Sequence, residues 1–232
     1  MPTTKRAKAP EKVASTKCFS LVPAAAQRQM YKTLAALKPL AFAEASGAEI
    51  AEVAVCLAIG EQDPVILACP ARGARAVRKG PKVAAGKGLS KDGRLTAATI
   101  SAAKAFLGDG KATALVCCGR LDPQENYRSV FNFAARHKLP ILFLVANSLT
   151  PGRRQELDLR TLYAEFGIPV FSVEANDAIA AYRVATEALH NARHHRGPCV
   201  IEALTLRGES VSRVAALSLL QSYMERHGNW PL

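Results

Sequence analysis

The stretch LVCCGRLDPQENYRSVFNFAARHKLPILFLVANSL, from Leu115 to Leu149, decides the fold of this chain. An apolar run ends at Cys118 and Gly119, a helical pattern follows, and a second apolar run ends at Asn147. This order predicts a strand, a helix and a second strand. Ligands of open parallel sheets bind beyond the carboxyl ends of the strands, so a site is expected at Cys118 to Leu121 and at Asn147 to Leu149.

Helical patterns and apolar runs alternate along the rest of the chain. Apolar strands are expected near Val65 to Cys69, Ala112 to Cys117, Ile141 to Ala146, Val170 to Val173 and Cys199 to Thr205. Helices are expected near Ala26 to Ala43, Ala48 to Ile59, Arg72 to Lys79, Thr96 to Leu107, Asp122 to His137, Leu157 to Phe166, Asp177 to Arg196 and Val211 to Arg226. Continuous apolar strands separated by helices predict an α/β fold, with a mostly parallel sheet and helices on both faces. Residues 18–232 are expected to form a single three-layer domain around one core.

With these elements in place, the chain resembles the thiamine diphosphate-binding α subunit of the 2-oxoacid dehydrogenases, the first components of the pyruvate and branched-chain dehydrogenase complexes. Val130 to Ala135 and Leu139 to Leu144 match the family's stretch between two cofactor motifs. Further family signatures are matched at Leu21 to Pro23, Gln29 to Leu34, Gly47 to Asp63, Phe166 to Pro169, Asn176 to Asp177 and Gly197 to Thr205. These matches occur in the family's order, so the resemblance implies the thiamine diphosphate-binding fold.

The resemblance also shows where a metal ligand is missing. It places Cys118, Gly119, Arg120 and Leu121 on the family's Gly-Asp-Gly-Ala motif, and Ala146, Asn147 and Ser148 on its Glu-Asn-Asn motif. Asn147 follows Gly119 by 28 positions, which is the interval of the family's motif. Mg²⁺ takes hard oxygen ligands and usually one or two carboxylates. Gly119 offers no side-chain oxygen and Arg120 adds a cation, so weak binding of a Mg-diphosphate is expected.

Three further cofactor elements of the family are altered. The segment from Cys69 to Gly73 stands at the family's Tyr-Arg-x-His-Gly, with Pro70 at the phosphate-binding Arg and Arg72 at the His. Glu209 stands at a family histidine, and only PKVAAGKGLSKDGRL remains of a long cofactor-binding insert. A retained fold with altered cofactor elements predicts a pseudoenzyme. The candidate cofactor-binding positions are Arg72, Cys118, Gly119, Arg120, Asn147 and Ser148, and no catalytic or metal-binding residue is assigned.

Two functional hypotheses from different classes follow. The first is a degenerate α-like subunit that keeps its fold to bind a partner, either a β-like dehydrogenase subunit or a second copy of the chain. The second is a divergent active oxidoreductase subunit that needs a β-like partner and thiamine diphosphate, or one with a rewired site. In the rewired site, Arg72, Arg120 and Arg207 gather to hold a phosphorylated ligand, because arginine binds phosphate in bidentate geometry.

The net charge of +12 is concentrated in two segments. Met1 to Lys17 contains five basic residues and one acidic residue, and Arg72 to Arg94 contains eight basic residues and one acidic residue. Residues 1–17 are expected to form a disordered basic tail. Basic clusters bind nucleic acids or acidic partners. Aromatic residues are not interleaved with these clusters, so specific nucleic-acid binding is kept only as a third hypothesis.

The cysteines and the apolar runs suggest the cellular setting. Six cysteines lie mostly inside apolar runs without paired metal spacing, which favours buried free thiols in a reducing cytoplasm. Cys117 and Cys118 are interpreted as buried thiols at a strand end and not as a redox pair. No apolar run approaches the ~20 residues that span a bilayer, so no membrane association is expected.

Three weaker motifs are interpreted structurally. Asp109 precedes an apolar strand, so it is expected in the helix-to-strand turn. The segment from Gly80 to Gly88 has the wrong spacing for a phosphate-binding loop and lacks its Ser or Thr. His190, His194 and His195 have no carboxylate or thiol beside them in the sequence and are expected at a solvated helix end.

Overall fold

The computed structural model describes residues 20–37, 48–78, 82–83, 90–109, 113–121, 127–149, 159–206 and 213–231. Within these residues, six strands form one sheet in the order β2-β1-β3-β4-β6-β5, and every neighbouring pair is parallel. The strands are β1 (Val65–Leu67), β2 (Lys82–Val83), β3 (Ala114–Arg120), β4 (Ile141–Leu149), β5 (Val170–Glu174) and β6 (Cys199–Leu206). The predicted α/β fold with a parallel sheet is confirmed.

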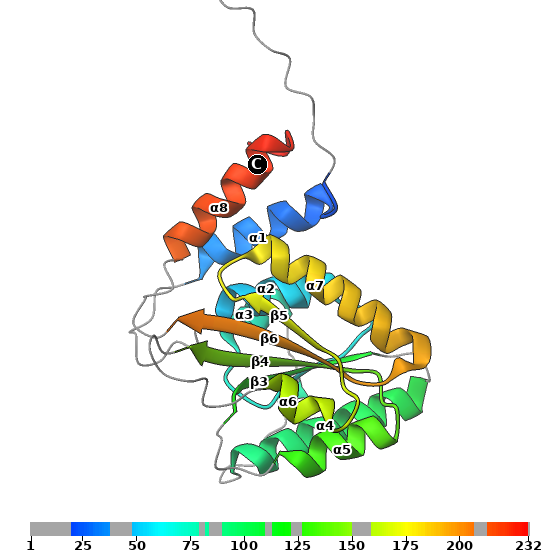
Figure 1. Ribbon diagram of the computed structural model, residues 1–232. Coiled ribbons are helices and arrows are strands. Elements are labelled where there is room, and N and C mark those ends of the chain that lie inside the picture. Colours follow the sequence, from blue (N-terminus) through cyan, green and yellow to red (C-terminus); the bar gives the residue numbers. More distant parts are fainter. Residues whose placement is uncertain are drawn as a thin grey trace, which may run out of the picture.

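Helices cover both faces of this sheet (Figure 1). They are α1 (Ala24–Ala36), α2 (Glu49–Ala58), α3 (Arg72–Val77), α4 (Lys91–Asp109), α5 (Arg128–Arg136), α6 (Leu159–Ala164), α7 (Ala178–Asn191) and α8 (Arg213–Arg226). One face carries α4, α5 and α6, and the other carries α2, α3 and α7. The α1 and α8 helices pack against each other as an outer layer beyond α2 and α7.

The core consists of two apolar clusters, one on each face of the sheet. Successive strand residues point to opposite faces of the sheet. Cys117 therefore belongs to the cluster between the sheet and α2 and α7, whereas Val116 belongs to the cluster between the sheet and α4 and α5. In the second cluster, the Phe131 ring lies edge-to-face with Phe143 at 4.9 Å and with Tyr163 at 4.6 Å. Burial on both faces explains why the central strands have continuous apolar sequences.

Two buried or capping carboxylates fix the ends of elements. The Asp177 side chain accepts the Ala180 N–H at 2.9 Å and caps α7, as the sequence pattern predicts. Asp63 is buried, accepts the Thr113 N–H at 2.9 Å and pairs with Arg193, which follows α7. Asp63 therefore joins the amino end of β1 to the start of β3 and to the end of α7.

The outer layer is attached through polar and aromatic contacts between the two chain ends. The Ser20 and Tyr223 hydroxyls are 2.9 Å apart, and the Asn229 amide donates to the Gln27 side-chain oxygen at 3.1 Å. The Tyr31 and Trp230 rings are in edge-to-face contact, with their centroids 4.9 Å apart. No helix in the described ranges is long and apolar enough to cross a bilayer.

The structure corrects several predicted bounds. β3 continues to Arg120 and β4 to Leu149, so the candidate positions lie in the last residues of these strands and not beyond them. The extension has a physical cause, because Arg120 still pairs with Ala146 in the parallel ladder. The sequence pattern does not predict β2, since two residues show no periodicity.

Helix starts also differ from the prediction. α4 begins at Lys91 and not at Thr96, and α5 begins at Arg128. Asp109 is the last residue of α4, in agreement with its expected place before β3. The predicted tail at residues 1–17 and the predicted helix start at Asp122 lie outside the described residues.

Candidate functional site at the carboxyl edge of the sheet

The carboxyl ends of β1, β3, β4 and β6 meet at one edge, because all these strands are parallel. The edge brings together the candidate positions from three elements. Arg72 follows β1, while Gly119 and Arg120 end β3, and Asn147 lies near the end of β4. Glu209 and Arg207, which were considered for the same edge, lie outside the described residues, as does the side chain of Ser148.

Gly119 is the position where the resemblance predicts the loss of a carboxylate. Its φ is +67°, and the ladder shifts register between Cys117 and Gly119, so the backbone adopts a conformation that favours glycine. A Cβ atom at this position would lie 3.0 Å from both the Cβ and the Sγ of Cys69. The Cys69 side chain would therefore have to give way by a few tenths of an ångström to any side chain at position 119.

Cys69 lies just after β1 and is half-buried. Burial, and then the nearby Glu52 carboxylate, raise the pKa of the Cys69 thiol from 9.0 to about 12, although Arg94 and Arg75 act in the opposite direction. The thiol is therefore protonated at neutral pH. A protonated thiol is a poor nucleophile and a poor metal ligand.

Two neighbouring cysteines are buried on opposite faces of β3, as the sequence predicts. The hydrogen bond with the Cys56 thiol, followed by burial, holds the pKa of Cys117 well above its ordinary value. Burial, followed by the nearby Cys69, raises the pKa of Cys118 in the same way. The five described cysteines are free thiols: Cys56, Cys69, Cys117, Cys118 and Cys199.

Arg72 begins α3 directly after the turn that contains Cys69 and Pro70, and it is half-buried. The next residue, Gly73, donates its backbone N–H to Glu52 Oε2 at 2.8 Å. A Cβ at Gly73 would lie 2.2 Å from the backbone oxygen of Glu49. Only glycine allows α2 and α3 to approach this closely.

The β4 and β6 end of the edge carries a hydrogen-bonded polar cluster. Glu202 of β6 is only 3% exposed and accepts two short hydrogen bonds. Asn147 Nδ2 donates to Oε1 at 2.6 Å, and Ser172 Oγ of β5 donates to Oε2 at 2.6 Å. Arg160 of α6 donates to the same Ser172 hydroxyl at 3.2 Å. The Asn147 side-chain nitrogen is thus engaged inside the protein.

Tyr163 lies below this cluster on the face covered by α4, α5 and α6. Its side chain is fully buried, and its hydroxyl has no hydrogen-bond partner among the residues that the structure describes. Burial raises the pKa of Tyr163 strongly, and the nearby Cys118 and Glu202 act in the same direction. The phenol is therefore neutral and held in place by the Phe131 ring.

Comparison with known proteins places this edge in a family. A family model described as the dehydrogenase E1 component matches residues 75–212, which is more than half of the chain. The chain belongs to the dehydrogenase E1 component family. The matched segment contains β3, β4, β5 and β6 and therefore most of the carboxyl edge of the E1 fold.

Similar E1 chains are known from bacteria. The chain is 30% identical over 141 residues to the pyruvate dehydrogenase E1 component subunit alpha of Rhizobium meliloti, covering 57% of this chain and 37% of the relative. It is 29% identical over 126 residues to the 2-oxoisovalerate dehydrogenase subunit alpha of Bacillus subtilis, covering 52% and 35%. The chain thus spans little more than a third of the length of these E1 relatives.

A solved structure agrees on the fold. Transketolase from Campylobacter jejuni superposes on 88% of this chain and 43% of its own with a TM-score of 0.51 and 15% identity. At that identity the likeness concerns the fold alone. The E1 family assignment therefore depends on the sequence comparisons.

The residues at this edge do not fit the Mg-diphosphate that the E1 resemblance implies. Gly119 supplies no side-chain oxygen, and a carboxylate side chain there would start in tight contact with the Cys69 side chain. Among the residues that the structure describes, no group of three or more His, Cys, Asp or Glu side chains is arranged to hold a metal ion.

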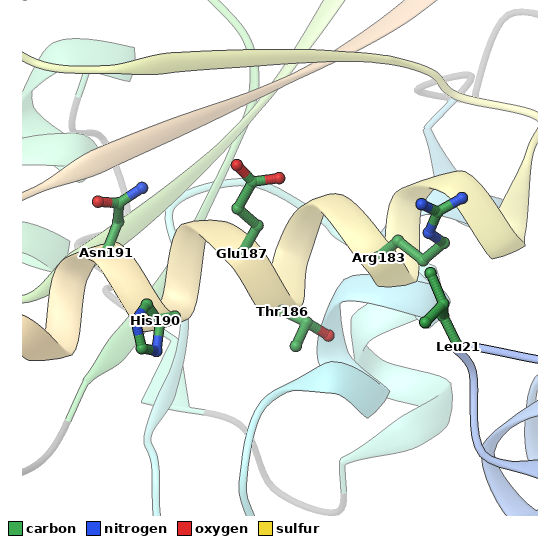
Figure 2. Close-up of a pocket in the computed structure, with 6 residues that line it drawn as sticks. All are labelled: Leu21, Arg183, Thr186, Glu187, His190 and Asn191. Carbon is green, nitrogen blue, oxygen red and sulfur yellow. The ribbon is translucent and has the colours of Figure 1, made fainter.

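A surface hollow of about 580 Å³ lies elsewhere, along α7. Figure 2 shows that its lining side chains come from α7 and from Leu21, which precedes α1. The lining residues are Leu21, Arg183, Thr186, Glu187, His190 and Asn191. His190 at the end of α7 and His194 just after it are exposed, as the sequence predicts. The hollow is lined by α7 and Leu21 and does not include the candidate positions at the sheet edge.

The sequence interpretation missed three residues that shape the edge. Glu52 lies among the apolar residues of α2, whose first turn also contains Glu49, and a carboxylate within that apolar pattern was the available signal. Glu202 interrupts the apolar run of β6 in the same way. The role of Cys69 had no sequence signal, since its contact with Gly119 joins two separate strands.

Proposed function

We propose that this E1 relative has lost the 2-oxoacid dehydrogenase reaction and acts as a binding or structural subunit. The contact between Cys69 and Gly119 is the observation that supports this proposal most strongly. A Mg-diphosphate site needs a hard oxygen ligand at this strand end. Here Gly119 supplies no side-chain oxygen, and the neutral Cys69 thiol lies tightly against the place where a side chain would start. The positive φ of Gly119 adds a cost for aspartate.

The retained fold is explained if the chain still serves as an assembly partner. Apolar side chains are buried on both faces of the sheet, and the buried Glu202 accepts hydrogen bonds from Asn147 and Ser172. Selection for catalysis is not needed to keep such contacts, since each stabilises the fold. We expect a β-like dehydrogenase subunit or a second copy of this chain as the partner, because the relatives are named as alpha subunits.

Purification of the native chain, followed by mass spectrometry of the proteins that accompany it, tests this role. A stoichiometric partner that stays bound through gel filtration is the expected result. The purified complex should then be assayed for oxidative decarboxylation of pyruvate and of branched-chain 2-oxoacids, with Mg²⁺ and thiamine diphosphate added. Turnover that disappears when Asn147 is changed to alanine would overturn the proposal.

The alternative function is a divergent enzyme with a phosphorylated ligand at the same edge. It is favoured because Arg72 begins α3 just after β1 and Arg120 ends β3, and β1 and β3 are neighbouring strands. Joint replacement of Arg72 and Arg120 by alanine should then abolish the binding of any phosphorylated ligand found in a screen. Unchanged binding would remove this alternative.

A further inference from the structure

Two exposed histidine side chains lie against each other where α7 ends. His190 belongs to the last turn of α7, and His194 belongs to the π-helical turn Ala192–Arg196 that follows it. Their ring centroids are 3.9 Å apart, and their planes are tilted by 40°. Two nitrogens that bind one metal ion at about 2.0–2.1 Å lie no more than about 4 Å apart, so rings this close can share an ion.

A hydrogen bond determines which nitrogen of the His194 ring carries a hydrogen. Its Nδ1 lies 2.8 Å from the backbone oxygen of His190. A carbonyl oxygen can only accept, so Nδ1 is the donor, and Nε2 of the neutral ring keeps its lone pair. Metal-bound histidines almost always donate their other ring N–H to an acceptor of this kind. His194 Nε2 is therefore oriented as a ligand.

The turn that carries His194 is fixed to the body of the domain. Its neighbour Arg193 pairs with the buried Asp63, which precedes β1. Because Cys199 begins β6 shortly after this turn, the two histidines lie toward the amino ends of the strands. This place is remote along the strands from the candidate site at their carboxyl ends. π-helical turns are rare and are frequent at functional sites.

The described residues supply two ligands here and not three. Figure 2 shows that Glu187, one turn before His190 on α7, points away from the His190 ring. Within the described part of the chain, no three His, Cys, Asp or Glu side chains are grouped to hold a metal ion. Imidazole nitrogen suits Zn²⁺, Cu²⁺ and Ni²⁺, whereas Mg²⁺ takes oxygen ligands.

We propose that His190 and His194 form a surface site for a divalent transition-metal ion, which binds one ring nitrogen of each histidine and completes its coordination with water. This inference goes beyond the proposed function and does not depend on it, because neither histidine lies at the carboxyl edge. An ion held in this way links α7 to the turn that follows it. It also stabilises the folded chain, in which alone the two rings are held together.

Calorimetric titration of the full, untagged chain with NiCl₂ tests the site. Ni²⁺ binds imidazole and does not oxidise the cysteine thiols. One ion per chain is expected, and an excess of Mg²⁺ should not compete. Loss of a group that only orients a ligand costs about 10–100-fold in metal affinity, so His190→Ala and His194→Ala should each weaken binding at least about tenfold.

His227→Ala is the matched control. His227 Nδ1 lies 2.7 Å from the Tyr223 backbone oxygen, and its ring stacks on the Tyr223 ring, so it repeats the arrangement of His194 without a second histidine. This variant should bind Ni²⁺ as the unmodified chain does. The absence of saturable binding to the folded chain, a loss in only one of the two α7-end variants, or an equal loss in His227→Ala would overturn the proposal. Each of these results leaves the proposed function intact.

If either α7-end variant fails to fold, nitrogen NMR of the unmodified ¹⁵N-labelled chain gives the answer. On addition of Zn²⁺, which is diamagnetic, the ring-nitrogen resonances of His190 and His194 should shift together and saturate, while those of His227 stay in place. Unchanged resonances of either His190 or His194 would overturn the inference.

Discussion

The two ends of the carboxyl edge have opposite chemistry. At the β4 and β6 end, the Glu202 carboxylate accepts hydrogen bonds from the Asn147 amide nitrogen and the Ser172 hydroxyl. At the β1 and β3 end, the Cys69 sulfur lies against Gly119. On the proposed function, the β4 and β6 end keeps its internal contacts, while the Cys69 side chain, which follows β1, lies tightly against the end of β3.

This difference also separates contacts that hold the fold from positions that hold a ligand. The hydrogen bonds of Glu202 stabilise the packing of β4, β5 and β6 whether or not a ligand binds. A carboxylate at position 119 would have no such internal role. If ligand binding is no longer selected, as we propose, only positions that hold a ligand are free to change.

The largest expected effect concerns the chemical reactivity of Cys69. With a pKa raised from 9.0 to about 12, its alkylation by iodoacetamide at pH 8 should be roughly 1,000-fold slower than that of the same thiol in the unfolded chain. Mass spectrometry of the Cys69 peptide over time measures both rates. Equal rates in the folded and unfolded chains would show that the thiol is not held in this buried place.

The same pKa shift has a consequence for stability at high pH. The unfolded thiol loses its proton near pH 9, whereas the folded thiol keeps it to about pH 12. The folded chain therefore binds more protons between these values, so this contribution to stability is complete below pH 9 and is lost as the pH rises toward 12. Urea unfolding of the Cys69→Ala variant, compared with the unmodified chain at pH 8 and pH 10.5, should show the smaller alkaline loss in the variant.

Glu202→Ala is expected to have the largest effect on stability. It leaves the Asn147 amide and the Ser172 hydroxyl without their acceptor in a buried place, which should lower the free energy of unfolding by about 3 kcal/mol. Urea denaturation monitored by circular dichroism measures the change. A loss below about 1 kcal/mol would mean that the hydrogen bonds of Glu202 stabilise the fold no more than those of an exposed residue.

Gly119→Asp restores the family carboxylate at the other end and should cost about 2 to 3 kcal/mol, from the positive φ and from the contact with Cys69. Gly167→Asp is the matched control, because Gly167 has a φ of +65° and no atom of the described residues lies within 4 Å of its Cβ position. It should cost only about 1 kcal/mol. Adding Cys69→Ala should recover part of the loss for Gly119→Asp, and additive effects of the two changes would refute the contact.

Ser172→Ala is expected to have the smallest effect. It removes one of the two hydrogen bonds to Glu202 but leaves the bond from Asn147, so the free energy of unfolding should fall by about 1 kcal/mol. The same urea experiment measures it. A loss as large as that for Glu202→Ala would indicate that Ser172 holds the carboxylate alone.

The fold was predictable from the sequence because its signals are local and repeated. Continuous apolar runs such as Ile141 to Ala146 predict buried parallel strands, and the alternation with helical patterns predicts the layers. The candidate positions in β3 and β4 lie in the last residues of these strands, at the edge where the ends of the parallel strands meet. Their role as a cofactor site stays a prediction. Strand length was underestimated at Arg120 and Leu149, because ladder pairing continues through polar residues that carry no apolar signal.

The contacts that determine the chemistry of the edge were not predictable in the same way. The Cys69 and Gly119 contact depends on the bulge in β3 and on the register between β1 and β3. The bond between Glu52 and Gly73 depends on the close approach of two helices. Neither contact distance can be inferred from the spacing of residues along the chain.

Calorimetric titration of the purified chain with thiamine diphosphate and Mg²⁺ decides whether the ligand space at the β1 and β3 end is closed. We predict no saturable heat at micromolar cofactor, with or without Mg²⁺, for a chain whose folding is verified by circular dichroism. A Mg²⁺-dependent dissociation constant in the micromolar range would show that the edge still accepts the diphosphate and would contradict the proposed loss of function.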